Sequence, residues 1–195
     1  MQDAKKGILN VLYGFLGQIV IICLGLVIPR LVLVSYGSEV NGLLTSVSQI
    51  FTCFSLLEAG VGVASLQALY GPVANNDREK IQGIMAATHH FYKKTGYLYA
   101  LAVTVLAFAY PVFVDSDIPY WTVVLVILFG GLGNCINFFY QGKYKILMQV
   151  EGYSYISINI TTLINVLTSL AKVVLLLMGY NVLAVQFSFF VINIL

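Results

Sequence analysis

Three charged side chains lie inside otherwise apolar runs of the sequence: Arg30, Glu58 and Lys172. On insertion scales a charge at the centre of a membrane helix costs about 2.5–3.5 kcal/mol, so each should face protein or water rather than lipid. Arg30 and Lys172 fall in the same half of their helices, where two cations would suit an anion. Glu58 lies nearer the middle, where it would form an ion pair or carry a coupling proton.

Arg30 has two interpretations. It follows Pro29, which can kink a helix and free backbone carbonyls that then need a partner or water. Its guanidinium then either faces a cavity or reaches out to the lipid headgroups.

Polar residues accompany these charges at spacings of three and four, which places them on single helix faces. The first stripe is Asn41, Thr45, Ser48, Thr52, Ser55, Ala59 and Gly62, flanked by Gln49 and Glu58; the second is Gly130, Asn134, Asn137 and Gln141; the third is Thr161, Asn165, Thr168 and Lys172. Helix packing explains the small and hydroxyl residues. A water-filled cavity also explains the amides and charges. The predicted cavity residues are Arg30, Lys172, Asn134, Asn137, Asn165 and Gln49.

The composition predicts a membrane protein. The chain has 195 residues, of which 59% are hydrophobic and 9% charged. Soluble domains carry about 25% charged residues, so lipid must be the solvent for most of this surface. A net charge of +2 without a basic cluster gives no sign of nucleic-acid binding. The three cysteines lie far apart, and His89 and His90 are adjacent and point in different directions on a helix, so we expect no metal site and no cofactor.

Five apolar runs are long enough to cross a bilayer, which takes about 20 residues as a helix. They cover roughly 8–34, 43–70, 95–114, 121–141 and 154–178. A sixth, 182–195, is too short to cross, so we expect the protein to continue beyond it. The predicted fold is an all-α polytopic membrane bundle of about six transmembrane helices. The predicted connections, 35–42, 71–83, 115–119, 142–153 and 179–181, are too short for a catalytic domain, and we expect no enzyme.

The basic residues of the connections predict the orientation. One side holds Lys5, Lys6, Arg78, Lys80, Lys93, Lys94, Lys143 and Lys145, whereas the other holds Glu39, Asp115 and Asp117. We therefore expect a cytoplasmic N terminus.

The stretch "IPRLVLVSYGSEVNGLLTSVSQIFTCFSLLEAGVGVASLQALYGPVANNDREKIQ" resembles the opening of polysaccharide-biosynthesis flippases of the multidrug/oligosaccharidyl-lipid/polysaccharide exporter superfamily. The shared features are an Arg near the end of the first helix, a Gly-bearing turn, a polar second helix with a Glu-Ala-Gly element, and an Asp-x-Glu-Lys loop. "NVLTSLAKVVLLLMGYN" is similar to the fifth helix of these flippases.

The resemblance implies one N-terminal lobe of a two-lobe transporter with 12 to 14 helices, whose C-terminal lobe is the obligatory partner. It implies flipping of a polyprenyl-pyrophosphate-linked oligosaccharide across a bacterial plasma membrane by alternating access. Arg30 matches the arginine of the lipid II flippase branch that contacts pyrophosphate, and Glu58 matches the acid of its second helix. Two further basic positions of that branch are apolar or Cys53 here, which favours a capsular, exopolysaccharide or teichoic-acid type of substrate.

Two alternatives remain open. A multidrug extruder of the same superfamily handles cations and should have an acidic cavity, whereas the buried charges here are two basic and one acidic. A non-transport membrane protein of polysaccharide assembly, such as a sugar transferase, should gather carboxylates near a membrane surface. Asp77 and Glu79 share a loop, but Arg78 and Lys80 make that stretch a solvated charge run.

Overall fold

The computed structural model describes residues 2–114, 116–136, 138–139 and 142–194, with the side chains of 2–6, 57–59 and 194 outside the described part. Its helices are α1 (Gln2–Ala74), α2 (Arg78–Phe113), α3 (Tyr120–Ile136), α4 (Gly142–Val150), α5 (Ser154–Leu177) and α6 (Val182–Ile194). The described part of the chain has no strand. The fold is therefore an all-helical bundle, as the sequence predicts.

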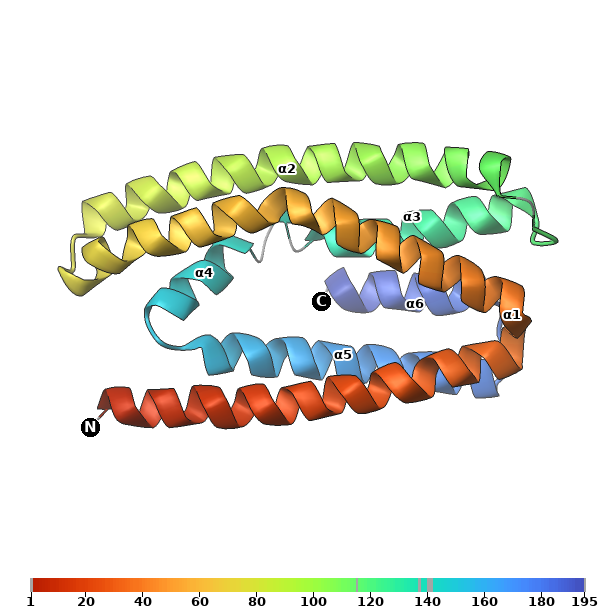
Figure 1. The fold of residues 1–195 in the computed structure, drawn as a ribbon, viewed down its shortest axis with the longest axis horizontal. Helices are drawn as coiled ribbons and strands as arrows, with labels where there is room; N and C mark the ends of the chain where they lie inside the picture. The colour runs from red at the N-terminus through yellow and green to blue at the C-terminus, as the bar shows by residue number, and fades with distance from the viewer. Residues whose placement is uncertain (1, 115, 137, 140–141, 195) are drawn as a thin grey trace.

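Gly37 divides α1 into two limbs, residues 2–36 and 38–74 (Figure 1). Its φ of 84° and ψ of 178° belong to a region that is essentially restricted to glycine. The first limb runs one way along the bundle and the second limb returns, so this single residue reverses the chain.

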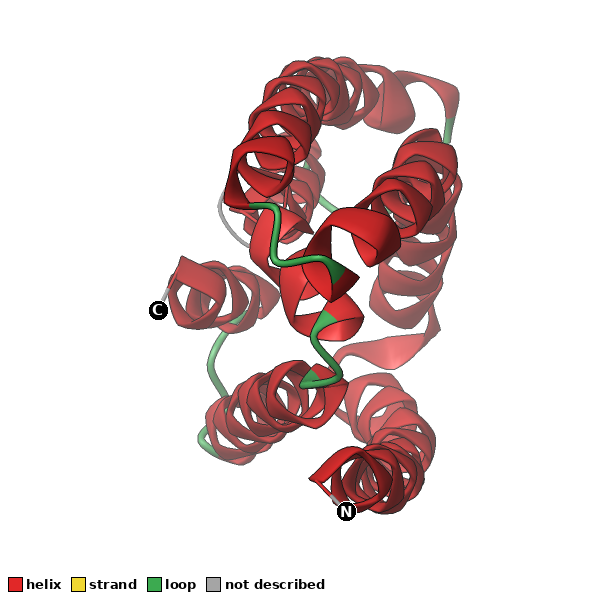
Figure 2. Ribbon diagram, turned by 90° about the vertical axis from the view of Figure 1, so that its left-hand side faces the viewer, coloured by secondary structure: helices red, strands yellow, loops and turns green. Residues whose placement is uncertain are grey.

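The helices form two long pairs with shorter helices between them. The first limb of α1 runs beside α5, and the second limb runs beside α2, while α3, α4 and α6 lie between these pairs (Figures 1 and 2). The turns at Gly37, 116–119 and 178–181 lie at one end, called here the acidic end because Glu39 and Asp117 are there. The N terminus and the connections 75–77 and 151–153 lie at the other, called here the basic end because Arg78 and Lys80 directly follow the connection 75–77.

The helices differ from the predicted spans at the basic end. The second limb of α1 continues to Ala74 and α2 begins at Arg78, so the predicted connection 71–83 shrinks to three residues. α3 ends at Ile136, whereas the predicted span continued to 141. The predicted connection 142–153 contains α4. Apolar length sets where a helix can cross lipid, but it does not set where the helix stops.

Glycines allow the helices of the core to approach closely. A Cβ on Gly131 of α3 would lie 2.4 Å from Cγ1 of Val103 in α2. Val103, Tyr99 and Ile127, on the two helices that meet here, are fully buried, as is Leu69 further along α1.

Asn10 ties the first limb of α1 to the start of α5. Its Oδ1 accepts a hydrogen bond from the backbone N–H of Tyr155 at 2.7 Å, and its Nδ2 donates to the Gly152 carbonyl at 3.1 Å. At the acidic end, the Tyr36 hydroxyl donates to the Tyr180 carbonyl. A side chain of α1 thus forms a hydrogen bond at each end of the α1–α5 pair.

Much of the outer surface is apolar. Val11, Leu26 and Val34 of α1 are each more than 70% exposed, as is Leu177 of α5. By length and composition, three of the described helices can cross a membrane, namely α1, α2 and α5, while α3 and α6 are shorter apolar helices. These long apolar helices indicate a membrane protein.

A candidate cationic hollow between the helices

Two adjoining hollows lie between the long helix pairs. The central hollow has a volume of about 570 Å³, and the end hollow, toward the acidic end, has about 300 Å³. Both are lined by Ser48, Phe51, Asn134 and Phe189. Because these four residues form a common wall, the two hollows adjoin.

The polar stripe of α1 forms one wall of both hollows. Asn41 and Thr45 line the end hollow, Ser48 lines both, and Thr52 and Ser55 line the central hollow. The four hydroxyls each donate to a carbonyl one turn earlier in the same helix, at 2.7–2.9 Å. Each hydroxyl proton is therefore used within α1, and the lone pairs of the hydroxyl oxygen remain able to accept a hydrogen bond.

The stripe of α5 forms the opposite wall. Thr161 and Asn165 line the central hollow, and Lys172 lines the end hollow. Thr168 is buried between these levels, and its Oγ1 has no hydrogen-bond partner in the described part of the protein. The Nζ of Lys172 lies 4.9 Å from the centroid of the Phe189 ring, within the range of a cation–π interaction.

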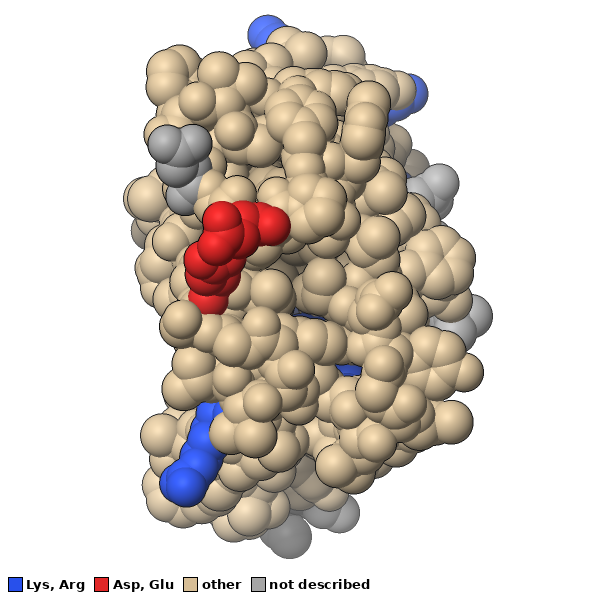
Figure 3. Space-filling view, turned by 90° about the vertical axis from the view of Figure 1, so that its right-hand side faces the viewer, with Lys and Arg blue, Asp and Glu red and all other residues tan. Residues whose placement is uncertain are grey.

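Lys145 supplies a second cation, at the opposite side of the hollows. It lies on α4 and lines the central hollow together with Thr161 and Asn165. α4 approaches α2 closely, since a Cβ on Gly142 would lie 2.5 Å from Cε1 of Tyr92. Lys145 therefore lines the central hollow and Lys172 the adjoining end hollow. Figure 3 shows the acidic end of the molecule, with acidic side chains gathered on one side and basic atoms visible between other side chains near its middle.

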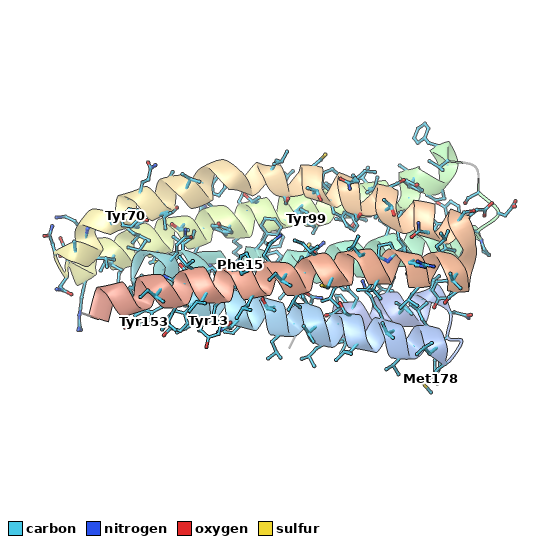
Figure 4. The ribbon with its side chains drawn as sticks, turned by 60° about the horizontal axis from the view of Figure 1, so that its bottom comes forward. Tyr13, Phe15, Tyr70, Tyr99, Tyr153 and Met178 are labelled. Carbon is cyan, nitrogen blue, oxygen red and sulfur yellow. The ribbon has the colours of Figure 1, made fainter. Side chains whose placement is uncertain are left out.

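Among the described residues, neither hollow is lined by Asp or Glu. Their walls consist of hydroxyls, amides, two ammonium groups and aromatic rings. Tyr99 of α2, labelled in Figure 4, points into the centre of the bundle and lines the central hollow. Hydroxyls and amides can hydrogen-bond sugar hydroxyls, and ammonium groups can bind phosphate oxygens.

The structure gathers only some of the predicted cavity residues. Asn134 lines both hollows, Asn165 lines the central one and Lys172 lines the end one. Asn137 and the Glu58 side chain lie outside the described residues. The positions one turn to either side of Glu58, Ser55 and Gly62, line a groove that Lys145 also lines.

Arg30 and Gln49 were predicted to line the cavity, and the structure places both elsewhere. Both side chains are exposed, and neither lines a hollow described here. Pro29, one residue before Arg30, does line the end hollow. Successive helical residues point about 100° apart, so Arg30 is turned away from the face that Pro29 shares with Val32.

Several lining residues were not predicted, among them four with polar or aromatic side chains on the short helices α4 and α6. Lys145 was assigned to a connection, and Gln186, Phe189 and Asn193 lie on the short α6. Gln186 and Asn193 are seven residues apart, a helical spacing that would have identified this face as a fourth polar stripe. For Lys145 the sequence carried no such signal, because its neighbours suggested a connection.

Comparisons of the chain with protein-family models, curated proteins and solved structures found no match. Together, the fold and the hollows define a helical membrane protein whose interior, in its described part, is lined by hydroxyls, amides and two lysines.

Proposed function

We propose that this protein is one lobe of a membrane transporter that flips a polyprenyl-pyrophosphate-linked oligosaccharide from the cytoplasmic to the outer leaflet for cell-surface polysaccharide synthesis, by alternating access. The observation that carries the proposal is the pair Lys145 and Lys172, which line two adjoining hollows whose walls carry hydroxyls and amides. A pyrophosphate and its sugars lose their hydration in hydrocarbon, and these groups would replace it.

The proposal also covers the membrane, the orientation, a second lobe and the role of Glu58. The chain would sit in a bacterial plasma membrane with the basic end in the cytoplasm, as the distribution of Lys and Arg predicts. A second lobe of about equal size would complete the transport path. Glu58 would provide ion coupling or an ion pair.

The depth of the two lysines supports flipping in particular. Lys172 is five residues before the end of α5, about 8 Å along the axis. Thr161, which lines the central hollow with Lys145, is 16 residues before that end, about 24 Å. With a hydrocarbon core of about 30 Å, the two ammonium groups would lie near opposite leaflets.

The test is a Lys172→Gln substitution in the host cell at the gene's own locus. We expect surface polysaccharide to fall at least tenfold, because a charge-assisted bond worth about 1.5–3 kcal/mol is lost, with lipid-linked oligosaccharide accumulating inside. Lys172→Arg should keep most of the export because it keeps the charge, and Lys143→Gln, on α4 outside the hollows, should leave export unchanged. Export at the normal level in the Lys172→Gln cells would refute the proposal. If these cells export normally but lose resistance to cationic drugs, the multidrug extruder would be favoured.

A further inference from the structure

The exposed face of α2 changes from apolar to polar at Lys94. Between Lys94 and the end of the helix, this face carries large apolar side chains that are all exposed: Tyr97, Leu98, Leu101, Val105, Phe108 and Val112. Between Lys94 and the start of the helix, the same face carries smaller or polar side chains, also exposed: Lys80, Gly83, Ala87 and His90. Spacings of three and four residues place both sets on the side of α2 that lies opposite the buried Tyr99 and Val103.

The apolar part of this face is as long as a membrane is thick. Val112 lies 18 residues beyond Lys94, about 27 Å along the helix axis. The hydrocarbon core of a bilayer measures about 30 Å. The whole of α2 has 36 residues, about 54 Å, so it is much longer than this core. Lys94 therefore marks the level at which α2 leaves the hydrocarbon.

The part of α2 before Lys94 forms a hairpin with the end of α1. The two arms are joined by a buried hydrogen bond, in which the Thr88 Oγ1 donates to the Ser65 Oγ at 2.9 Å. Because the arms run antiparallel, about residue 60 of α1 lies level with Lys94. We call residues 60–92 the projecting hairpin. In Figure 1 its tip extends beyond the start of α5 at the basic end.

The surface of the projecting hairpin is suited to water. Among its described residues, the large hydrophobic side chains that are exposed are Val63, Tyr70 and Phe91. Its other exposed positions are Ala, Gly or polar residues. Isolated exposed hydrophobic residues are normal on a surface that faces water.

Two ammonium groups lie at the level where the surface changes. Lys93 and Lys94 are both exposed, and in the part of the chain that the structure describes neither forms an ion pair with a carboxylate. Lys94 lies at the middle of the exposed face, and Lys93 is turned about 100° to one side. The stem of a lysine can lie along an apolar surface while its ammonium group reaches the headgroups.

We propose that Lys93 and Lys94 bind the phosphate groups of anionic phospholipids in the leaflet at the basic end, and that the projecting hairpin stands in the water beyond that leaflet. Anionic lipids attract lysines that lie next to a membrane-spanning helix. The inference goes beyond the proposed function and does not depend on the transported substrate.

Fluorescence quenching tests the depth of the hairpin. A bimane fluorophore is attached to single cysteines in the full chain without its three native cysteines, in nanodiscs whose lipid has brominated acyl chains. We expect strong quenching at Leu98→Cys and Val105→Cys. Ala87→Cys should be quenched little, because it lies on the same face about 16 Å nearer the hairpin tip than Leu98. Equal quenching at all three positions would show that the hairpin lies in the hydrocarbon.

The same fluorophore at Leu98→Cys, one turn from Lys94, tests the lipid preference. The nanodiscs contain phosphatidylglycerol or phosphatidylcholine with the same nitroxide on the acyl chain. We expect half-maximal quenching by phosphatidylglycerol at a mole fraction about fivefold lower or less, because each lysine near a membrane surface favours anionic lipid by about that factor. Equal quenching by the two lipids would refute the proposal.

Two double variants remove the same charge at different depths. Lys93→Gln with Lys94→Gln should abolish the preference. Arg78→Gln with Lys80→Gln should leave it intact, because these residues lie about 21–24 Å further along the axis, beyond the Debye length of about 10 Å in 0.1 M salt. An equal loss in both variants would show that net charge alone attracts the lipid, with no site at Lys94.

Inorganic phosphate separates a lipid site from a site for free phosphate. Added at constant ionic strength, it should leave the preference for phosphatidylglycerol unchanged, because a lipid headgroup is held at this level by its own acyl chains. If phosphate abolishes the preference, the lysines bind free phosphate and the assignment to lipid is wrong.

Discussion

Asn10 caps a helix that begins more than 140 residues later in the chain. Tyr153, the N-cap residue of α5, makes no side-chain capping bond, and the Asn10 amide bonds to both sides of that helix start. Tyr13, one turn further along α1, stacks on Tyr155 with ring centroids 6.1 Å apart. These contacts set the register of α1 against α5.

Asn10→Ala should destabilise the protein by about 1–2 kcal/mol, because it removes a cap and leaves backbone groups at the start of α5 unpaired. Thermal unfolding in detergent checks this against Asn159→Ala, an exposed asparagine on α5 that should change little. Equal melting temperatures for the two variants would show that the tertiary cap contributes nothing.

Asp77 caps α2 and pairs with Lys80. Its Oδ1 accepts from the Lys80 backbone N–H at 3.2 Å, and its Oδ2 lies 2.9 Å from the Lys80 Nζ. The hydrogen bonds from the Lys80 side chain and backbone lower the pKa of Asp77 below its usual value. A lowered pKa in the folded state adds stability above the unfolded pKa, about 3.9, and this is lost as the pH falls through the folded value.

We therefore expect the pKa of the Asp77 carboxyl group to depend on the side chain at position 80. With Lys80→Gln, the pKa of Asp77 should rise toward its usual value, because the ammonium group is gone. Carbon-detected NMR of protein labelled at aspartate checks this. Since both side chains are open to solvent, the change in overall stability should be small. An unchanged titration would show that Lys80 does not perturb the carboxyl group.

At the scale of elements, the bundle depends on a close helix contact at a glycine, where only one of the two helices contributes a side chain. Gly131 of α3 meets Val103 of α2 and Phe51 of α1, with a Cβ predicted to lie 2.4 Å and 3.0 Å from them. Phe51 also lines both hollows. Packing at Gly131 thus fixes the wall of the site as well as the core.

Gly131→Ala should cost about 1–3 kcal/mol through overpacking. Adding Val103→Ala should restore part of the loss, because the shortened side chain makes room for the new methyl group. Gly83→Ala in α2, where a Cβ meets nothing within 4 Å, should be neutral or stabilise by about 0.5–1 kcal/mol. Unfolding in denaturant measures all three, and a neutral Gly131→Ala would contradict the close contact.

At the scale of the whole molecule, the chain turns alternate between two ends. Gly37 and 178–181 lie at the acidic end, while 75–77 and 151–153 lie at the basic end (Figure 1). In a membrane these ends would face opposite compartments, and the excess of Lys and Arg predicts that the basic end is cytoplasmic.

Single-cysteine variants test this orientation. In a background with Cys23, Cys53 and Cys135 replaced by Ala, Ser38→Cys should react with an impermeant maleimide added outside intact cells. Asn76→Cys should react only after the cells are opened. Both positions are exposed in the structure. Labelling of Asn76→Cys in intact cells would reverse the predicted orientation.

The sequence by itself determined the class of solvent and the helix faces. A chain that is 59% hydrophobic must place most of its surface in lipid, and spacings of three and four identify a polar face wherever a helix forms. The stripes of α1 and α5 follow from this periodicity, and the structure uses both as walls of the hollows.

Only the tertiary structure decided which faces meet. Lys145 joins the hollow because α4, which begins at Gly142, packs against Tyr92 of α2. Arg30 stays outside because it is one residue away from the lining face of its helix. Periodicity describes one helix at a time, whereas a cavity depends on the rotation, the register and the breaks of several helices, which are set by long-range packing.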